Sequence, residues 1–361
     1  MIPLARPTLG QEETDAVAEV LSTGMLVQGE RVARFEAGLR ERTCRVHAVA
    51  VSSGTAALEL ALEALGIGAG DEVLVPAFTW PSPAHAIRRR GATPVLVDVD
   101  PDEWNATAAA FGAARTGMTR AAIAIDQFGA PARHPEIAEA LGDLPVIEDA
   151  ACAIGASLGD RPAGAFGRMA CLSFHPRKVL TTGEGGAVVT DDPDLADRIR
   201  TLRNHGQASP GKFTEAGGNH RLTEIQGALG LVQLTRLDAM IARRRHLAGR
   251  YREALGGLPL RWQRPAPGAE GNAQTFGLVL DEDAPMTRDA LLGHLKEAGI
   301  GAGILSYALH RLDTVNPADD AAYPVTSSLI DRGFAVPLHA TLTDADQDQV
   351  IGALVRALGA P

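Results

Sequence analysis

The sequence predicts an α/β protein, in which a large domain holds a seven-stranded, mostly parallel sheet and a smaller C-terminal α+β domain follows. Between residues 46 and 190, short apolar runs recur between turn residues, and helical patterns separate most of them. Their apolar residues are consecutive rather than alternating, which is typical of strands that are covered on both faces. The runs are Val46–Val51, Val73–Val75, Pro94–Val97, Ala121–Ile125, Val146–Ile147, Ala170–Phe174 and Ala187–Val189.

The pattern of the chain changes near residue 240. Before that point, Thr223–Leu237 has the apolar spacing of a long helix. After it, helical segments surround fewer strand-like runs, such as Gln274–Leu280. Because 361 residues exceed what a single core usually organises, we expect a large domain of residues 1–240 and a small domain of residues 241–361.

Composition excludes several classes of protein. Hydrophobic residues make up 45% and charged residues 22%, as in soluble globular proteins, and the net charge is −10. The short basic clusters Arg88–Arg90 and Arg243–Arg245 are expected to be solvated helix faces, so nucleic acid is not an expected partner. Cys44, Cys152 and Cys171 lack the spacing of a metal site or a disulfide framework, which favours a reducing cytoplasm. No apolar stretch suits a membrane span or a signal peptide.

Lys178 is the first candidate for chemistry. It follows an expected strand end and precedes the glycine-rich turn Thr182–Gly186, which leads into the next strand. Loops at this edge of a parallel sheet gather ligands. A lysine amine can form a Schiff base there if an enclosed site keeps it unprotonated. Because a lone lysine beside a glycine-rich turn is usually an ordinary loop residue, this role needs companion residues.

Asp149 is the second candidate. The run that begins at Val146 ends in Glu148 and Asp149, and small residues follow. A carboxylate in this position can cap the next helix. It can also face the nitrogen of a bound pyridine ring and keep that nitrogen protonated, so that the ring accepts electrons. Asp149 suits the second role better than Glu148 because it is closer to the loop.

Two further segments follow expected strands. In Ser52–Leu58, Gly54 allows close backbone approach, and the helix N-terminus presents free N–H groups to an anion. A simple N-cap by Ser53 or Thr55 explains the same residues. The second segment contains Trp80, which could stack on a flat heteroaromatic ring or lie in the core.

Together these segments resemble the DegT/DnrJ/EryC1/StrS family of pyridoxal phosphate (PLP)-dependent aminotransferases. The likeness extends over most of the chain and keeps the order of the family's blocks. The matching blocks are Ile2–Glu13, Gly24–Gly29 with Phe35-Glu36, Val51–Leu58, Gly218–Gln226 and Pro337–His339. The resemblance implies the fold type I of PLP-dependent transferases.

The resemblance also implies residue roles. Lys178 would carry PLP as a Schiff base, and Asp149 would pair with its pyridine nitrogen. Asn219 would reach the phosphate of the neighbouring subunit's cofactor, which implies a homodimer with shared active sites. The other cofactor contacts would come from Gly54, Thr55, Trp80, Cys152 and Ser173. Substrate contacts would come from Met25, His220, Tyr307 and His310.

Two positions depart from the family pattern. Cys152 stands where the family commonly has Gln, near the ring hydroxyl of the cofactor. A thiol is smaller and donates weaker hydrogen bonds, so that contact could be lost or filled by a substrate or water. His220 replaces the usual Tyr, which leaves the local substrate contact open.

The resemblance implies transfer of an amino group from L-glutamate or L-glutamine to a keto sugar, with a nucleotide-linked 4-keto or 3-keto deoxysugar as the first choice. A keto-cyclitol or another natural-product ketone is the next choice. A sugar dehydratase on this scaffold would lack the lysine. A non-catalytic regulatory homologue would not need Lys178, Asp149 and Ser173.

Overall fold

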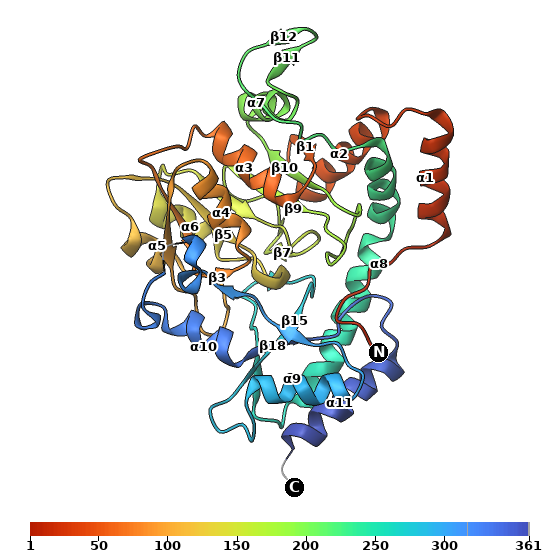
Figure 1. The fold of residues 1–361 in the computed structure, drawn as a ribbon, viewed down its shortest axis with the longest axis vertical. Helices are drawn as coiled ribbons and strands as arrows, with labels where there is room; N and C mark the ends of the chain where they lie inside the picture. Colours follow the sequence, from red (N-terminus) through yellow and green to blue (C-terminus); the bar gives the residue numbers. More distant parts are fainter. Residues whose placement is uncertain (316, 360–361) are drawn as a thin grey trace.

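The computed structural model describes residues 1–315 and 317–359. Its centre is a seven-stranded sheet in the order β1-β10-β9-β6-β5-β2-β4 (Figure 1). Neighbouring strands are parallel except β10, which is antiparallel to both β1 and β9. The strands are β1 His47–Val51, β2 Glu72–Pro76, β4 Thr93–Val97, β5 Thr119–Ile125, β6 Val146–Asp149, β9 Met169–Ser173 and β10 Gly186–Thr190. The predicted fold class is confirmed, and a strand lies at each predicted run.

Helices cover both faces of this sheet, which explains why its strands are apolar on consecutive residues. One face packs against α3 (Gly54–Ala64), α4 (Ser82–Arg89) and α7 (Pro193–Arg203). The other face packs against four helices: α2 Glu30–Thr43, α5 Ala108–Ala114, α6 His134–Leu141 and α8 Glu224–Leu255.

The long helix α8 differs from its prediction. Its start is as expected, since Thr223 accepts a hydrogen bond from the Gln226 N–H in a capping box. Its predicted end at Leu237 is wrong, because a buried stripe continues past that residue to Leu255. Figure 1 shows α8 passing alongside both sheets of the molecule. Residue 240, the expected domain boundary, therefore lies inside a continuous helix.

A second sheet is four-stranded and antiparallel, in the order β13-β15-β18-β16. Its strands are β13 Leu260–Trp262, β15 Phe276–Leu280, β16 Gly303–Ile304 and β18 Gly333–Val336. They share a core with α9 (Arg288–Glu297), α11 (Asp344–Leu358) and the end of α8. The N-terminus joins this part, because Ile2 exchanges backbone hydrogen bonds with Gly299 and Gly301. The division into residues 1–240 and 241–361 stays a prediction.

The other elements are short or peripheral. No helix in the described part of the chain is long and apolar enough to span a membrane. The short or peripheral elements are α1 Gln11–Thr23, α10 Pro324–Arg332, β3 Phe78–Thr79, β7 Ser157–Leu158, β8 Arg161–Pro162, β11 Gln207–Ser209, β12 Lys212–Phe213, β14 Ala269–Glu270, β17 Tyr307–Ala308 and the single turns η1 Gln127–Gly129, η2 Leu309–Arg311, η3 Asp313–Val315 and η4 Asp320–Ala322.

The buried carboxylate of Glu224, at the start of α8, fixes the start of α2. Its oxygens accept hydrogen bonds from the N–H groups of Gly29, Arg31 and Val32 at 2.8, 3.0 and 3.0 Å. These donors have no acceptor within their own helix, because they belong to its first turn. The contact anchors the segment that contains Met25 to the long helix.

We predict that Glu224→Gln lowers the free energy of unfolding by about 3 kcal/mol, because hydrogen bonds to a charged acceptor are strong and the new amide NH₂ would face N–H donors. Urea unfolding monitored by circular dichroism measures this loss. The control is Asp238→Ala, which removes an exposed ion pair with Arg42 and is expected to cost less than about 1 kcal/mol. Equal losses in the two variants would contradict the anchoring role.

Candidate active site

The register of β6 and β9 brings the predicted chemistry to one edge of the sheet. Asp149, the last residue of β6, pairs with Cys171. Ser173 lies two residues beyond Cys171 and thus on the same face as Asp149. The loop after Ser173 is closed by a hydrogen bond from the Phe174 N–H to the Gly185 carbonyl, and it carries Lys178.

Lys178 lies in a partly enclosed position. Its Nζ donates to Cys152 Sγ at 3.0 Å. The chain has two other lysines, Lys212 and Lys296, and both are exposed, whereas Lys178 is half-buried. The structure therefore places Cys152, a predicted cofactor contact, next to the Lys178 amine, and Lys178 is the one lysine of the chain that is not exposed.

Asp149 is buried, with 6% of its surface exposed. Its Oδ1 accepts a hydrogen bond from the Ala151 N–H at 3.1 Å, and no donor among the described residues reaches Oδ2. Burial raises the pKa of Asp149, while the Ala151 hydrogen bond and the charge of Lys178 lower it. A buried carboxylate with a free oxygen fits a cationic N–H donor such as a protonated pyridine nitrogen.

The start of α3 forms a cradle opposite Ser173. Ser53 is the N-cap, since its Oγ accepts from the Ala56 N–H at 3.0 Å, and the N–H groups of Gly54 and Thr55 belong to the open first turn. A Cβ added to Gly54 would lie 2.8 Å from Ser173 Cβ, so only glycine fits there. The capping interpretation holds for Ser53, and the remaining N–H groups still fit a phosphate.

Trp80 lies at the surface and not in the core, with 57% of its area exposed. Its ring meets Tyr307 edge to face, with centroids 5.3 Å apart. The contact arises because β3 pairs with β17, so that Thr79 is opposite Tyr307. The structure thus brings together two predicted site residues that are far apart in sequence, one for the cofactor and one for the substrate.

His310 is placed differently from the predicted substrate contact. Its side chain is fully buried, and Nε2 lies 2.9 Å from Asp320 Oδ1 and 3.2 Å from Ser327 Oγ. Its ring stacks on Tyr323 at 4.6 Å. These contacts make His310 a packing residue of the interior, and we leave it out of the proposed substrate site.

The block that contains Asn219 and His220 is joined to the cradle turn. The His220 N–H donates to the Arg203 carbonyl, and the Ser52 N–H donates to the His220 carbonyl, both at 2.9 Å. Asn219 is exposed, and so is Met25, which has 72% of its surface accessible. Within one chain, Asn219 and Met25 face outward.

Sequence patterns did not indicate two amide side chains that contact the site. Asn272 and Gln274 hydrogen-bond to the segments of Cys152 and Lys178, respectively. Their only sequence signal is two amides on either side of a small residue, just ahead of an apolar strand. The expected solvated face at Arg243–Arg245 is also wrong in part, because Arg244 is buried.

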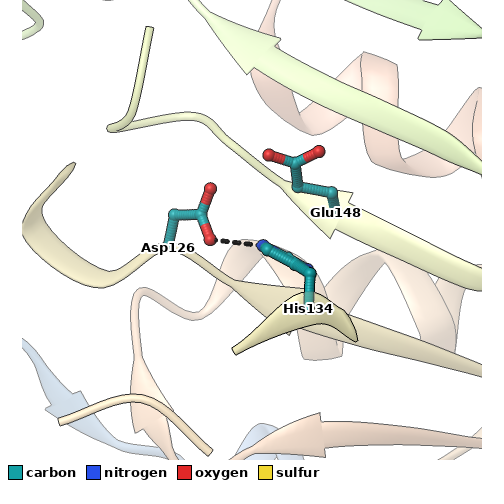
Figure 2. Close-up of side chains that lie close together, drawn as sticks. All are labelled: Asp126, His134 and Glu148. Atoms are coloured by element: carbon teal, nitrogen blue, oxygen red, sulfur yellow. Dashed lines mark hydrogen bonds and ion pairs between the residues drawn. The ribbon is translucent and has the colours of Figure 1, made fainter. Parts of the chain in front are cut away.

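A buried cluster of Asp126, His134 and Glu148 lies behind the sheet edge (Figure 2). Asp126 Oδ1 accepts from His134 Nε2 at 2.7 Å and from the Ala132 N–H at 2.9 Å. The oxygens of Glu148 accept from the N–H groups of Gly164 and Phe166. The ligand atoms lie within 4.8 Å of one another, and Asp126 Oδ2 and His134 Nδ1 have no hydrogen-bond partner among the described residues. The hydrogen bonds from the N–H groups of Ala132, Gly164 and Phe166 tie strand ends to loops.

The two carboxyl groups of this cluster hold their protons more tightly than exposed carboxyl groups do. Burial raises the pKa of Glu148, and the charge of Asp126 raises it further. Burial also raises the pKa of Asp126. Burial lowers the pKa of His134, which keeps its ring neutral. The two carboxyls therefore retain a proton in the folded state that exposed carboxyls would release.

The fold and its cofactor are those of the PLP-dependent aminotransferases. Within that class, the chain belongs to the DegT/DnrJ/EryC1/StrS aminotransferase family, whose model matches residues 7–355. The protein is accordingly a PLP-dependent transaminase, as the resemblance in its sequence blocks predicts.

Solved structures of this family match almost the whole chain. The aminotransferase TlmJ from Streptoalloteichus hindustanus is 33% identical, with 99% of this chain and 98% of that chain covered and a TM-score of 0.93. Spr1654 from Streptococcus pneumoniae, described as a sugar aminotransferase and solved in its PLP form, is 25% identical, with coverages of 99% and 98% and a TM-score of 0.94. A GDP-4-keto-6-deoxymannose-3-dehydratase with a trapped PLP-glutamate geminal diamine is 27% identical, with coverages of 98% and 100% and a TM-score of 0.92.

We predict that Glu148→Gln flattens the dependence of stability on pH. The unfolded glutamate titrates near pH 4, whereas the folded Glu148 keeps its proton to higher pH. The unfolded state thus binds fewer protons above about pH 4, so the free energy of unfolding falls as the pH rises. The neutral amide removes this contribution, and melting temperatures measured from about pH 5 to about pH 8 should fall less steeply than in the wild type.

The control for this prediction is Glu136→Gln, which changes an exposed glutamate on α6. It should leave the slope of the wild type unchanged. If the Glu148→Gln curve also ran parallel to the wild type, the buried carboxyl would not be holding a proton.

Proposed function

We propose that this aminotransferase moves an amino group from L-glutamate or L-glutamine to a keto sugar, with a nucleotide-linked 4-keto or 3-keto deoxysugar as the first candidate. The observation that carries the proposal is the half-buried amine of Lys178, which lies at the carboxyl edge of the sheet beside Cys152 and under the electrostatic influence of Asp149. A keto-cyclitol remains the second candidate for the acceptor. A cytoplasmic location agrees with both.

The residues at this edge of the sheet have different proposed roles. Bound PLP supplies an electron sink for the carbon from which the proton is removed. Lys178 would hold the cofactor covalently, and its amine, once free, would accept and return a proton at the reacting carbon. Asp149 holds the proton on the ring nitrogen. The N–H groups of Gly54 and Thr55, with the Ser173 hydroxyl, bind the phosphate.

Trp80 and Tyr307 form the open side of the proposed site. The exposed indole of Trp80 can cover one face of the cofactor ring, and Tyr307 supports the indole through the edge-to-face contact. Tyr307 is therefore our candidate for a residue that contacts both the cofactor-stacking ring and the acceptor. Cys152 occupies the position next to the Lys178 amine.

The dehydratase among the solved relatives shows that this scaffold also serves another reaction. Transamination needs an amine that binds the cofactor and later transfers a proton, and Lys178 supplies it. Lys178 therefore favours the aminotransferase over a sugar dehydratase. The same residue, together with Asp149, argues against a regulatory homologue without catalysis.

We also propose a homodimer with shared active sites. Met25 and Asn219 are exposed in the single chain, yet the segments that carry them are fixed, by Glu224 for the first and by the Ser52 turn for the second. Ordered, exposed residues of this kind suit contacts across a subunit interface. Asn219 would then complete the phosphate site of the partner.

We predict that Lys178→Ala loses the visible absorption band that PLP gives with the wild type, and that its turnover falls roughly 10³-fold. Borohydride reduction followed by peptide mass spectrometry should place the cofactor on Lys178 in the wild type. The controls Lys212→Ala and Lys296→Ala change exposed lysines and should behave as the wild type. Undiminished turnover in Lys178→Ala would refute the assignment. Keto-sugar nucleotides and keto-cyclitols screened with glutamate would then identify the acceptor.

A second prediction concerns the shared site. Lys178→Ala and Asn219→Ala should each be inactive as homodimers, whereas a mixture should regain activity, because one of the two sites in a heterodimer then carries neither change. Subunit exchange verified by native mass spectrometry is the control. No recovery despite proven heterodimers would count against a contribution of Asn219 to the partner's site.

A further inference from the structure

The side chain of Gln274 holds the peptide groups on both sides of Lys178. Its Nε2 donates to the Arg177 carbonyl at 2.7 Å, and its Oε1 accepts from the Val179 N–H at 2.8 Å. Gln274 is buried, with 8% of its surface exposed. A single side chain thus engages the peptide group before the lysine and the one after it, so that the backbone of Lys178 is fixed while its side chain stays free to move.

Asn272 acts in the same way on the segment of Cys152. Its Nδ2 donates to the carbonyls of Cys152 and Ile154 at 2.8 and 2.9 Å. Its Oδ1 accepts from the Gln274 N–H at 2.9 Å, which couples the two amides. The Asn272 side chain is fully buried against Gly129, where an added Cβ would lie 1.9 Å from its Oδ1.

The backbone between the two amides is held in an unusual conformation. Ala273 has φ of 54°, in the left-handed region that residues other than glycine rarely adopt. Buried Arg244 donates to the Gln274 carbonyl at 3.1 Å and to the Leu338 carbonyl at 2.9 Å. These contacts hold the segment that leads into β15 of the four-stranded sheet. Its two amide side chains therefore connect this segment to the Cys152 and Lys178 loops of the seven-stranded sheet.

We propose that Asn272 and Gln274, the amide pair, are positioning residues that set where the Lys178 amine lies relative to Cys152 and to the cofactor. The proposal rests on the proposed role of Lys178. Gln274 fixes the main chain of the lysine, and Asn272 fixes the main chain of its sulfur neighbour. The Nζ–Sγ contact itself is a weak constraint, since a thiol is a poor hydrogen-bond partner. The backbone contacts therefore determine the geometry from which the amine reaches its target.

The first test needs no turnover. In full-length protein with and without PLP, hydrogen–deuterium exchange should show the Val179 N–H of Gln274→Ala exchanging at least about tenfold faster than that of the wild type, because the acceptor Gln274 Oε1 is lost. The control is Gln263→Ala. Gln263 Nε2 also donates to two carbonyls, those of Glu103 and Gln127, but away from the lysine loop. It should leave Val179 exchange unchanged.

The second readout concerns the loaded enzyme. Gln274→Ala should lower kcat about 10- to 100-fold with a smaller change in the KM for glutamate, because misplacement affects the reaction step more than binding. The pH midpoint of the visible cofactor band should also shift, which a purely structural loss would not cause. Gln263→Ala should change neither.

Gln274→Glu covers the case in which the alanine variant is unstable. It keeps the acceptor for the Val179 N–H but sets a carboxylate oxygen against the Arg177 carbonyl, and protonation restores the donor. Its rate of cofactor capture relative to the wild type should therefore rise as the pH falls. Unchanged Val179 exchange together with an unshifted pH midpoint in Gln274→Ala, or a rate of cofactor capture in Gln274→Glu that does not depend on pH relative to the wild type, would overturn the positioning role of Asn272 and Gln274. A cofactor band retained by Lys178→Ala would instead overturn the proposed function.

Discussion

Hydrogen bonding between the parallel strands β6 and β9 determines where the site lies. Their register pairs Asp149 with Cys171, which aligns the ends of both strands at one edge. Side chains that follow these ends must then meet, since the carboxyl ends of parallel strands open on the same side. Strand β10 follows the lysine loop and lies between β9 and β1 in the sheet, antiparallel to both. Strand β1 continues directly into the turn that contains Gly54. The carboxyl ends of β1, β6 and β9 therefore lie at the same edge of the sheet, where Gly54, Asp149 and the lysine loop come together.

Burial of charge is the second constraint on this edge. Asp149 is buried, and its carboxylate accepts one hydrogen bond from the described residues, so its ionised form depends on a cationic neighbour. Glu148, the preceding residue, points to the opposite face of the sheet and belongs to the cluster of Figure 2. The adjacent carboxyl groups of Glu148 and Asp149 on β6 therefore have different contacts. Burial and the charge of Asp126 raise the pKa of Glu148, whose oxygens tie loops together, whereas Asp149 Oδ2 has no donor among the described residues.

The sequence could reveal whatever depends on local order. The apolar runs located every strand of the large sheet, and the turn residues after these runs singled out Lys178, Asp149 and Gly54 as candidates, because each lies at a strand or helix end with its own pattern. Contacts between distant segments were not predictable in this way. Arg244 looks like part of a solvated basic run until the segment of Gln274, just ahead of β15, covers it. His310 resembles a site residue until Tyr323 and Ser327 pack against it.

Cys152 shows how these constraints combine. A long amide side chain at this position could have fixed its neighbours by its own hydrogen bonds, whereas a thiol contributes little. The chain holds the same place by its main chain, since Asn272 binds the Cys152 and Ile154 carbonyls and Gln274 binds the peptides around Lys178. The position of the Lys178 backbone then depends on the segment that leads into the second sheet. This segment is more than a hundred residues away in sequence from Cys152. A weak side chain at the centre is compatible with a precise site because the backbone around it is fixed from outside.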